Sequence, residues 1–350
     1  MKKLRLNKAN WVNFATYGMV VIAFIVMQLM GSAGMLSSTI RGQLVPICAY
    51  VVMALSLNLT VGILGELSLG HAGFMSVGAF AGAVAASALP IPSDALRLAA
   101  AMLIGAILAG LVGVVVGVPV LRLNGDYLAI VTLAFGQIIK SIVENLYIGM
   151  DANGLHASFL ENRITFAPGG RMILNGPMGV NGISKISTFT AGFILIMIVL
   201  VIIFNLVNSR AGRAIMALRD NRIAAESVGI NVTKYKLMAF VTSAAMAGAA
   251  GTLFALGQNT ITASKFDFNM SILILVFVVL GGQGKMWGSI LAATFLTVLP
   301  ETPAMRELRD YRMLVYAMVM ILVMLATNSE QIRGLAGRIH PKRKGAGENG

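Results

Sequence analysis

The feature that most constrains this chain is a succession of strongly apolar runs, separated by short polar segments, along almost its whole length. A helix needs about 20 predominantly apolar residues to cross a bilayer. Because backbone in lipid must satisfy its own hydrogen bonds, the runs predict an all-α polytopic membrane protein with about ten transmembrane helices. The ten runs lie near Asn13–Met30, Leu44–Leu64, Leu67–Leu89, Leu96–Leu121, Tyr127–Tyr147, Phe189–Val207, Leu237–Leu256, Met270–Leu280, Trp287–Leu299 and Met313–Thr327.

The composition agrees with a chain that lies mostly in lipid. Hydrophobic residues make up 57% of the sequence and charged residues only 12%, whereas soluble proteins carry about 25% charged residues. The net charge of +13 could suggest a nucleic-acid partner, but the basic residues are spread over the tails and short loops instead of one patch. We therefore expect membrane lipid, and no nucleic acid, as a partner. The single cysteine, Cys48, lies in an apolar run, so no disulfide can form within the chain.

Basic residues indicate which side of the membrane each loop faces. They are concentrated in the N-terminal tail, in the segment 209–236 and after Gly334. Ten spans place these three regions on one side, and an excess of Lys and Arg marks the cytoplasmic side. We expect a multi-pass protein with both termini cytoplasmic, a transmembrane domain over 1–334 and a basic, disordered tail over 335–350.

Two regions of the sequence each allow two structural interpretations. The segment 148–188, on the expected outer side, is rich in turn-forming residues, and it forms either an ordered lip or a turn-rich connector. The eighth and ninth runs are short and separated only by Gly281–Lys285. They form either two tilted helices or one helix with a re-entrant segment.

The order of the runs suggests an internal repeat. With the first and sixth runs set aside, runs two to five and seven to ten form two sets of four, and members five apart run in opposite directions. This is the geometry of an inverted repeat, which many transporters share. Each half also holds a Gly-rich break, over Gly62–Gly82 and Gly281–Gly288. Small-residue spacings such as Gly78-x-x-x-Gly82 and Ala244-x-x-x-Gly248 predict close helix packing.

The polar segment 209–236 has the pattern of an amphipathic helix. Arg219, Arg222 and Glu226 gather on one side, Gly229 stands where the helix would end, and Gly212 stands just before it begins. The opposite side is an arc made by Ala214, Ala217, Leu218, Ala224, Ala225 and Val228, interrupted only by Asn221. Such a helix between two spans either lies on the lipid headgroups or docks a soluble partner.

The most unusual membrane stretch is Val61–Phe74, which combines glycines with polar groups. Gly62, Gly65, Gly70 and Gly73 loosen or interrupt the helix, while Glu66, Ser68 and His71 place polar groups near a membrane edge. Unwound backbone at membrane depth is tolerated only where protein or a water-filled cavity surrounds it. The stretch is therefore either a lining of the translocation path, or a short cytoplasmic turn at Glu66 followed by a packing histidine with a satisfied hydrogen bond.

A second polar pair occurs in the fifth run. Lys140 and Glu144 stand one helical turn apart near its outer end. They are either a polar site on the translocation path or a pair of long side chains that reach the interface and neutralise one another.

Nothing in the sequence indicates catalysis. The stretch Gly282–Met286 superficially resembles a phosphate-binding loop, but position 279 is valine and Met286 replaces the Ser or Thr of such a loop. No catalytic triad, carboxylate pair or metal-ligand cluster is visible. We expect a transport subunit that binds no cofactor of its own. An ion-coupled secondary transporter is the less favoured class, because its spans would need more charged groups than Lys140 and Glu144.

Five stretches carry a family resemblance: Asn58–Phe74, Gly125–Gly136, Gly212-Arg-Ala-x5-Asp-Asn221, Val228–Lys236 with its Val-Gly-Ile-Asn-Val-x-x-Tyr-Lys pattern, and Tyr311–Leu314. They resemble the membrane permease of branched-chain amino-acid ABC importers, of the LivM type, and the resemblance covers roughly residues 44–326. The same superfamily includes permeases for urea and other amides. One departure is at Thr327–Gly334, where the family often has an Arg-Pro-Gln-Gly-Leu-like sequence.

The resemblance implies a subunit of the bacterial inner membrane that carries leucine, isoleucine and valine from a periplasmic binding protein to the cytoplasm. It also implies a second permease of the LivH type and two cytoplasmic ATPases, which would bind ATP and Mg²⁺. In that family the loop between the repeats meets the ATPase. ATPase coupling is therefore expected at Gly212, Arg213, Ala214, Ala217, Leu218, Arg219, Asn221, Ala224 and Gly229.

Overall fold

The structure is a bundle of membrane-length helices. The computed structural model describes residues 8–35, 37–123, 125–151, 154–160 and 170–299, with the single positions 314, 318 and 321. In this part of the chain, eight helical segments are long and apolar enough to cross a membrane, and one shorter apolar helix follows them. The expected helical membrane fold is thereby confirmed. The tenth run lies outside the described residues except for those three positions, and so does the whole tail 335–350.

The helices follow the apolar runs closely, and a π-helix and two 3-10 turns complete them. They are α1 (Lys8–Ser32), α2 (Ser38–Asn58), α3 (His71–Ala88), α4 (Asp94–Val120), α5 (Asp126–Glu144), α6 (Phe189–Asn208), α7 (Arg210–Asp220), α8 (Arg222–Ser227), α9 (Val232–Ala255), α10 (Phe268–Gly281) and α11 (Met286–Val298), with the π-helix η1 (Leu59–Leu64) and the 3-10 turns η2 (Gly176–Met178) and η3 (Ala263–Lys265).

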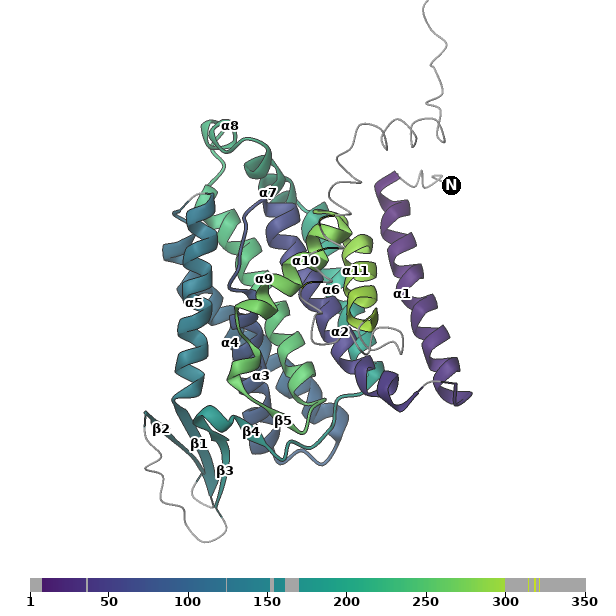
Figure 1. Ribbon diagram of the computed structural model, residues 1–350. Helices are drawn as coiled ribbons and strands as arrows, with labels where there is room; N and C mark the ends of the chain where they lie inside the picture. Colours follow the sequence, from purple (N-terminus) through teal and green to yellow (C-terminus); the bar gives the residue numbers. More distant parts are fainter. Residues whose placement is uncertain are drawn as a thin grey trace, which may run out of the picture.

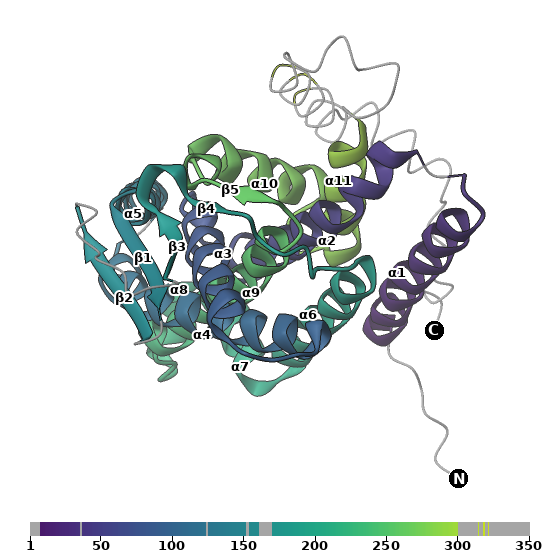
Figure 2. The same cartoon turned by 90° about the horizontal axis from the view of Figure 1, so that it is seen from below.

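Burial separates an inner group of helices from an outer one. The apolar window of α2 with η1 is 94% buried, that of α9 72% and that of α3 67%, whereas that of α1 is only 11% buried. Seen from below, α1 stands apart at the edge of the bundle (Figure 2). The exposed faces of α4 and α6 carry Leu111, Val115 and Ile198, as surfaces in contact with hydrocarbon require. A functional site is therefore expected among the inner helices.

Small residues bring α3, α4 and α9 into close contact, as the sequence spacings predicted. A Cβ atom at Gly78 would collide with the backbone of Gly248, and one at Gly248 would collide with the backbone of Gly105. Thr252 Oγ1 donates a hydrogen bond to the Gly78 carbonyl oxygen at 2.8 Å. Backbones this close gain van der Waals contact in lipid, where helix association has little hydrophobic driving force.

The eighth and ninth runs form two short helices joined by a turn. α10 and α11 pack against each other, and a Cβ atom at Gly281 would collide with the backbone of Gly288 and Ser289. The turn between them needs Gly282 and Gly284 in left-handed conformations, with φ of 89° and 79°. This region therefore forms two separate helices, and the crossing of the membrane by both stays a prediction.

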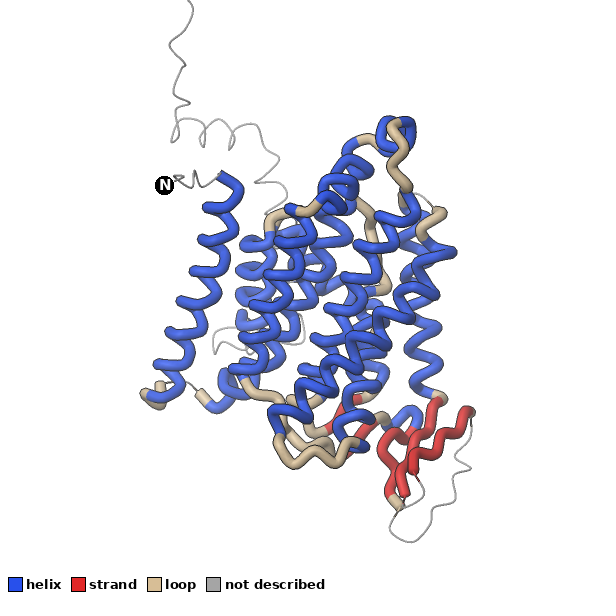
Figure 3. Tube along the Cα trace, turned by 180° about the vertical axis from the view of Figure 1, so that it is seen from behind, coloured by secondary structure: helices blue, strands red, loops and turns tan. Residues whose placement is uncertain are grey.

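The two ends of the bundle differ in architecture. α7 and α8 cover one end, which also holds the N-terminal end of α1 (Figure 1). All described strands lie at the opposite end (Figure 3). We call these the α8 end and the sheet end. The start of α1 thus lies at the same end as the segment 209–236, with the described part of 148–188 at the other end, and the side of the membrane that each end faces stays a prediction.

The sheet end holds a five-stranded antiparallel sheet that the all-α prediction missed. The strand order is β2-β1-β3-β4-β5. Its strands are β1 (Leu146–Asp151), β2 (Gly154–Phe159), β3 (Arg171–Asn175), β4 (Val180–Asn181) and β5 (Thr260–Ile261). Of the two alternatives for 148–188, the ordered lip is the better description of its described residues. The strands are short and interrupted by glycine, so the alternation of buried and exposed residues is visible only over β2.

The segment 209–236 is not the single amphipathic helix that its pattern predicted. Asn221 adopts an extended conformation, with φ of −156° and ψ of 102°, and separates α7 from α8. Its side chain accepts a hydrogen bond from the Ala224 N–H at 3.0 Å and so caps α8. Gly229 ends the second helix with φ of 85°, as expected. Gly212 lies inside the first turn of α7 rather than before it.

Candidate functional site

The Gly-rich stretch contains a true break in the helical backbone. α2 continues into η1, which ends at Gly65, and the positive φ of that glycine (81°) turns the chain. Residues 65–70 are not helical, and α3 begins at His71. His71 contacts Ser56, which lies eight residues before the end of η1. The non-helical segment therefore re-enters the bundle from the α8 end before α3 begins (Figure 1).

Side chains from two other helices bond the backbone of the non-helical segment and of the first turn of α3. The Leu69 N–H donates to Thr132 Oγ1 on α5 at 3.1 Å. The Ala72 N–H donates to Ser271 Oγ on α10 at 3.2 Å. Unwound backbone at this depth therefore has protein partners, as lipid requires. A glycine is needed at position 70, because a Cβ atom there would collide with the Thr132 carbonyl.

His71 and Ser68 are enclosed in this conformation. His71 Nε2 lies 2.8 Å from Ser56 Oγ and 3.4 Å from Ser243 Oγ, and its ring is 1% exposed. Ser68 is also 1% exposed. Neither Ser68 Oγ nor His71 Nδ1 has a hydrogen-bond partner in the described part of the chain. The contacts at Nε2 agree with the packing interpretation of His71, while these two unpaired atoms leave the path interpretation as a prediction.

That interpretation predicts state-dependent exposure of this segment. In a Cys48→Ala background, Ser68→Cys should be protected from a small polar thiol reagent in the resting protein, because the site is closed to solvent. Turnover with ATP should expose it and raise the labelling rate at least tenfold. Thr252→Cys, fully buried in the contact between α9 and α3, is the control and should stay protected. Complete protection of Ser68→Cys in every nucleotide state would contradict a path lining.

Glu66 is held by a lysine from the segment 209–236. Lys236 Nζ forms an ion pair and hydrogen bond with Glu66 Oε1. The side chains of Lys236 and Glu66 are only 4% and 14% exposed. Glu66 therefore lies at the α8 end, as the cytoplasmic-turn alternative proposed, but it is bonded to the first turns of α9 rather than free in solvent. The sequence offered no signal for this partner, because the two residues are 170 positions apart.

Arg219 makes a second bond between the same segments. Its Nη1 donates to the Gly62 carbonyl oxygen at 2.6 Å. Its side chain fills the space where a Cβ atom at Gly65 would stand, with Cγ 2.6 Å from that point. The sequence pattern placed Arg219 with Arg222 and Glu226 opposite the apolar arc and did not predict this contact. A one-dimensional helical pattern could not show that the turn after η1 approaches α7 from that side.

Asn58 connects the α10–α11 turn to the same place. Its Oδ1 accepts from the Gly284 N–H at 2.8 Å, and its Nδ2 donates to Ser289 Oγ at 2.8 Å. Gly62 has no room for a Cβ atom, because Asn58 and the backbone of Gly284 occupy that space. The Gly-rich breaks of the two halves thus pack against each other. We call this site the break junction, formed by Asn58, Gly62, Glu66, Arg219, Lys236 and Gly284.

The predicted apolar arc of the segment 209–236 is divided between two faces. Leu218 and Ala225 are buried and form a small cluster with Val232 at the start of α9. Ala217 packs against this cluster, while Ala214 is partly buried. On the outer side, Ala224 is exposed, and Ile223 and Val228 are 82% and 76% exposed. The outward apolar surface is therefore centred on α8.

The polar pair of α5 lies apart from the break junction. Lys140 Nζ and Glu144 Oε1 are 3.8 Å apart, and their side chains are 23% and 31% exposed. Gln137 and Ser141 are exposed on the same helix. Sequence reading overlooked these two, although they occur in an otherwise apolar span. Polar groups at membrane depth normally face protein or water, so this face of α5 differs from the apolar outer faces of α4 and α6.

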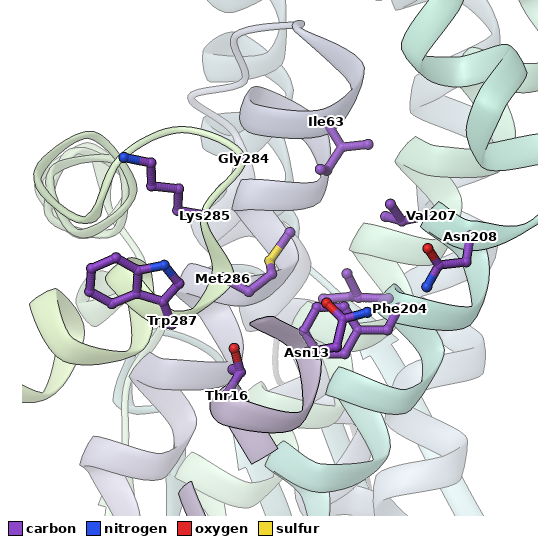
Figure 4. A pocket seen from close by; sticks show the side chains of 11 residues that line it. Asn13, Thr16, Ile63, Phe204, Val207, Asn208, Gly284, Lys285, Met286 and Trp287 are labelled. Atoms are coloured by element: carbon purple, nitrogen blue, oxygen red, sulfur yellow. The ribbon is translucent and has the colours of Figure 1, made fainter. Parts of the chain in front are cut away.

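A cavity of about 310 Å³ opens beside the break junction, between α1, α6 and the α10–α11 turn. Ile63, Phe204 and Met286 line it, with Asn13 and Asn208 (Figure 4). Lys285 and Trp287 lie on the side opposite Asn208 (Figure 4). The described residues contain no group of His, Cys, Asp and Glu that could hold a metal ion.

Comparison with known proteins identifies relatives over most of this chain. A family described as the permease component of branched-chain amino acid transport systems matches residues 39–324. The high-affinity branched-chain amino acid transport system permease protein LivM of Escherichia coli (strain K12) is 36% identical over 286 residues, which are 79% of this chain and 66% of that protein. The chain thus aligns with just under two thirds of the LivM length.

More distant relatives carry the names of sugar permeases. The ribose import permease protein RbsC of Escherichia coli (strain K12) is 27% identical over 80% of this chain and 82% of its own length. The fructose import permease protein FruG of Bifidobacterium longum is 25% identical over 80% of each chain. No solved structure matches this chain.

Proposed function

This chain belongs to the family of permease components of branched-chain amino acid transport systems, and we propose that it is a membrane subunit of an ATP-driven importer for leucine, isoleucine and valine. The observation that best supports this role is the bond from Arg219 on α7 to the Gly62 carbonyl of the broken helix. A soluble ATPase that moves α7 and α8 would act on membrane-buried backbone through this contact. In this proposal the partner ATPases bind ATP and Mg²⁺, and this chain binds no nucleotide.

The relatives favour branched-chain amino acids over the other substrates of related permeases. The identity to LivM is 36%, against 27% to RbsC and 25% to FruG. Urea and other amides stay as the alternative substrates, because the motifs that identify the family are shared with their permeases. The proposed orientation places the α8 end in the cytoplasm of a bacterial inner membrane, since basic residues are concentrated there.

The polar face of α5 supports a place for the second permease. Gln137 and Ser141 are exposed beside the half-buried pair Lys140–Glu144. Exposure of this face to lipid would be costly. We assign it to the side where the second permease, of the LivH type, closes the translocation path. A periplasmic binding protein would deliver substrate at the sheet end.

The exposed apolar residues of α8 give this proposal a sharp test. Ile223→Asp should weaken the binding of the ATPases at least tenfold, because a central apolar contact in an interface is worth about 2 kcal/mol or more. The membrane fold should survive, since Ile223 is 82% exposed. Thr233→Asp, which places the same charge at an exposed position in α9, is the control. Copurification of the ATPases with each variant measures the effect.

Full copurification with Ile223→Asp would contradict docking and favour a segment that lies on lipid headgroups. Ala224→Trp is a second probe of the same exposed face. Ala217→Trp would not be a clean probe, because Ala217 packs against the small inner cluster and a larger side chain would disturb α7 itself.

Reconstitution of the complete transporter tests the substrate. Proteoliposomes with both permeases, the ATPases and the binding protein encoded beside this chain's gene should take up leucine in an ATP-dependent, saturable manner. Excess isoleucine and valine should compete, whereas urea and ribose should not. Uptake of urea or ribose without uptake of leucine would overturn the proposed substrate class and leave the family assignment unchanged.

A further inference from the structure

The cavity beside the break junction lies between α1 and the rest of the bundle. α1 and α6 are antiparallel and touch through aromatic side chains: Phe24 stacks on Phe193 with ring centroids 4.1 Å apart, and Tyr17 meets Phe204 edge-on at 5.4 Å. About one turn beyond Tyr17, Asn13 lines the cavity, whose volume is about 310 Å³. The aromatic contacts therefore lie between the cavity and the sheet end, and the cavity itself lies at the level where α6 ends.

The surroundings of this cavity are those of a lipid-facing surface. α1 and α5 stand at opposite edges of the bundle in both views (Figures 1 and 2), so the cavity is not on the face assigned to the second permease. The outer side of α1 is apolar, with Phe14, Ile22 and Leu29 exposed by 63%, 64% and 62%. Trp287, which lines the cavity, is 43% exposed, and exposed tryptophans are typical of the headgroup level of a membrane. A ligand would reach the cavity from the bilayer.

The interior of the cavity is apolar, and separate elements contribute its walls. Ile63 comes from η1, Phe204 and Val207 come from α6, and Met286 is the first residue of α11. Figure 4 shows Met286 between the two sides of the cavity. A polar ligand would lose its hydration against such walls, whereas a hydrocarbon chain would not.

Positive charge flanks the cavity on two sides. Lys285 is exposed on one side of it, beside Trp287, and Asn208 lies on the opposite side (Figure 4). The Asn208 carbonyl oxygen accepts a hydrogen bond from Arg213 Nη1 at 3.3 Å, and Arg213 is exposed, so its guanidinium adds a second cation there. Basic pockets between membrane helices on the cytoplasmic side bind lipid headgroups.

A free amino acid fits this cavity poorly, whereas a phospholipid fits both of its parts. The ammonium group of an amino acid needs an acidic partner, and none of the described lining residues is acidic. An acyl chain suits the apolar interior, and phosphate oxygens can accept hydrogen bonds from Lys285 and Arg213. A negative headgroup is favoured over a zwitterionic one, because choline or ethanolamine would bring a third cation to the same place.

We propose that this cavity binds an anionic phospholipid, with an acyl chain in the apolar interior and the phosphate beside Lys285. The inference goes beyond the proposed function and does not rest on it, because lipid binding requires neither substrate nor ATP. The bound lipid contacts Ile63 of η1 and Met286 of α11, and it therefore supports the break junction from the side of α1.

Photolabelling of the complete transporter in detergent tests this site. The probe is phosphatidylglycerol with a photoreactive group in its acyl chain, and mass spectrometry of peptides should find labels on α1 and α6, around Tyr17 and Phe204. The probe concentration for half-maximal labelling should rise about fivefold in Lys285→Gln, the effect of one basic residue near an anionic lipid. Lys285→Arg should keep the wild-type value. Lys234→Gln removes an exposed cation at the same end but outside the cavity, and as the matched control it should also keep that value.

Competition between lipids identifies the headgroup. Unlabelled phosphatidylglycerol should displace the probe from α1 and α6, whereas phosphatidylcholine should not. Equal displacement by the two lipids would overturn the inference, and so would a wild-type half-maximal concentration for Lys285→Gln or a lack of labels on both helices.

The alternative occupant is this chain's own segment 300–350. A photoreactive phenylalanine analogue in place of Phe204 detects it, and the expected result with saturating phosphatidylglycerol is cross-linking to lipid. Cross-links into residues 300–350 under the same conditions would assign the cavity to that segment and overturn the inference. Failure of the wild-type complex to transport leucine would refute the proposed function and leave these binding results unaffected.

Discussion

Lys236→Met should lower the stability of the permease more than any other single substitution proposed for this chain. Lys236 and Glu66 form an ion pair in which both side chains are almost fully buried. Removal of one partner leaves a buried carboxylate without its counter-charge, and such losses cost about 3–5 kcal/mol. The midpoint of thermal unfolding in detergent, followed by the monodispersity of the purified protein, measures the effect.

The double variant Glu66→Gln/Lys236→Met distinguishes the charge effect from lost packing. It should recover most of the stability, since no unpaired charge stays buried. Lys234→Met removes an exposed cation two residues away and should change the midpoint very little, because exposed charges contribute only about 0–1 kcal/mol. If Lys236→Met unfolds at the same temperature as the wild type, the Lys236–Glu66 pair is solvated in the working protein. That result would contradict the burial of the pair in the structure.

The second large effect is expected at Arg219, on transport rather than on stability. Its bond to the Gly62 carbonyl is charge-assisted and partly buried, and a hydrogen bond to a charged group contributes about 1.5–3 kcal/mol. The alternative partner, Asp220, is 3.8 Å away, and the two side chains are 46% and 74% exposed, so that pair contributes little. The role of Arg219 therefore lies in its contact with the broken helix.

Most of the fold follows from the apolar pattern of the sequence. Spans are long, and their length and composition decide their structure before tertiary contacts do. Gly65 and Gly70 also predicted the break in the helical backbone, because glycines beside Glu66 and Ser68 do not suit a continuous span. The caps of α8 had a local signal as well: Asn221 stands three residues before Ala224, as an N-cap does.

The site itself could be predicted only in part, for a physical reason. Arg219 and Gly62 are 157 residues apart, and Lys236 and Glu66 are 170 residues apart. Such pairs depend on how the ends of the helices meet, which helical periodicity does not encode. The sheet was missed because its strands are short and because β5 lies between α9 and α10, far along the chain from the other four strands. The inverted repeat and the roles of Lys140 and Glu144 stay predictions.

The central claim is that α7 transmits ATPase motion to the broken helix through Arg219. The most direct test is the number of ATP molecules hydrolysed per leucine imported, measured with the complete transporter in proteoliposomes. Arg219→Ala should keep its ATPases and continue to hydrolyse ATP, while this ratio rises about tenfold or more. Arg210→Ala, the exposed arginine at the start of the same helix, should keep the wild-type ratio. A wild-type ratio for Arg219→Ala would contradict the claim.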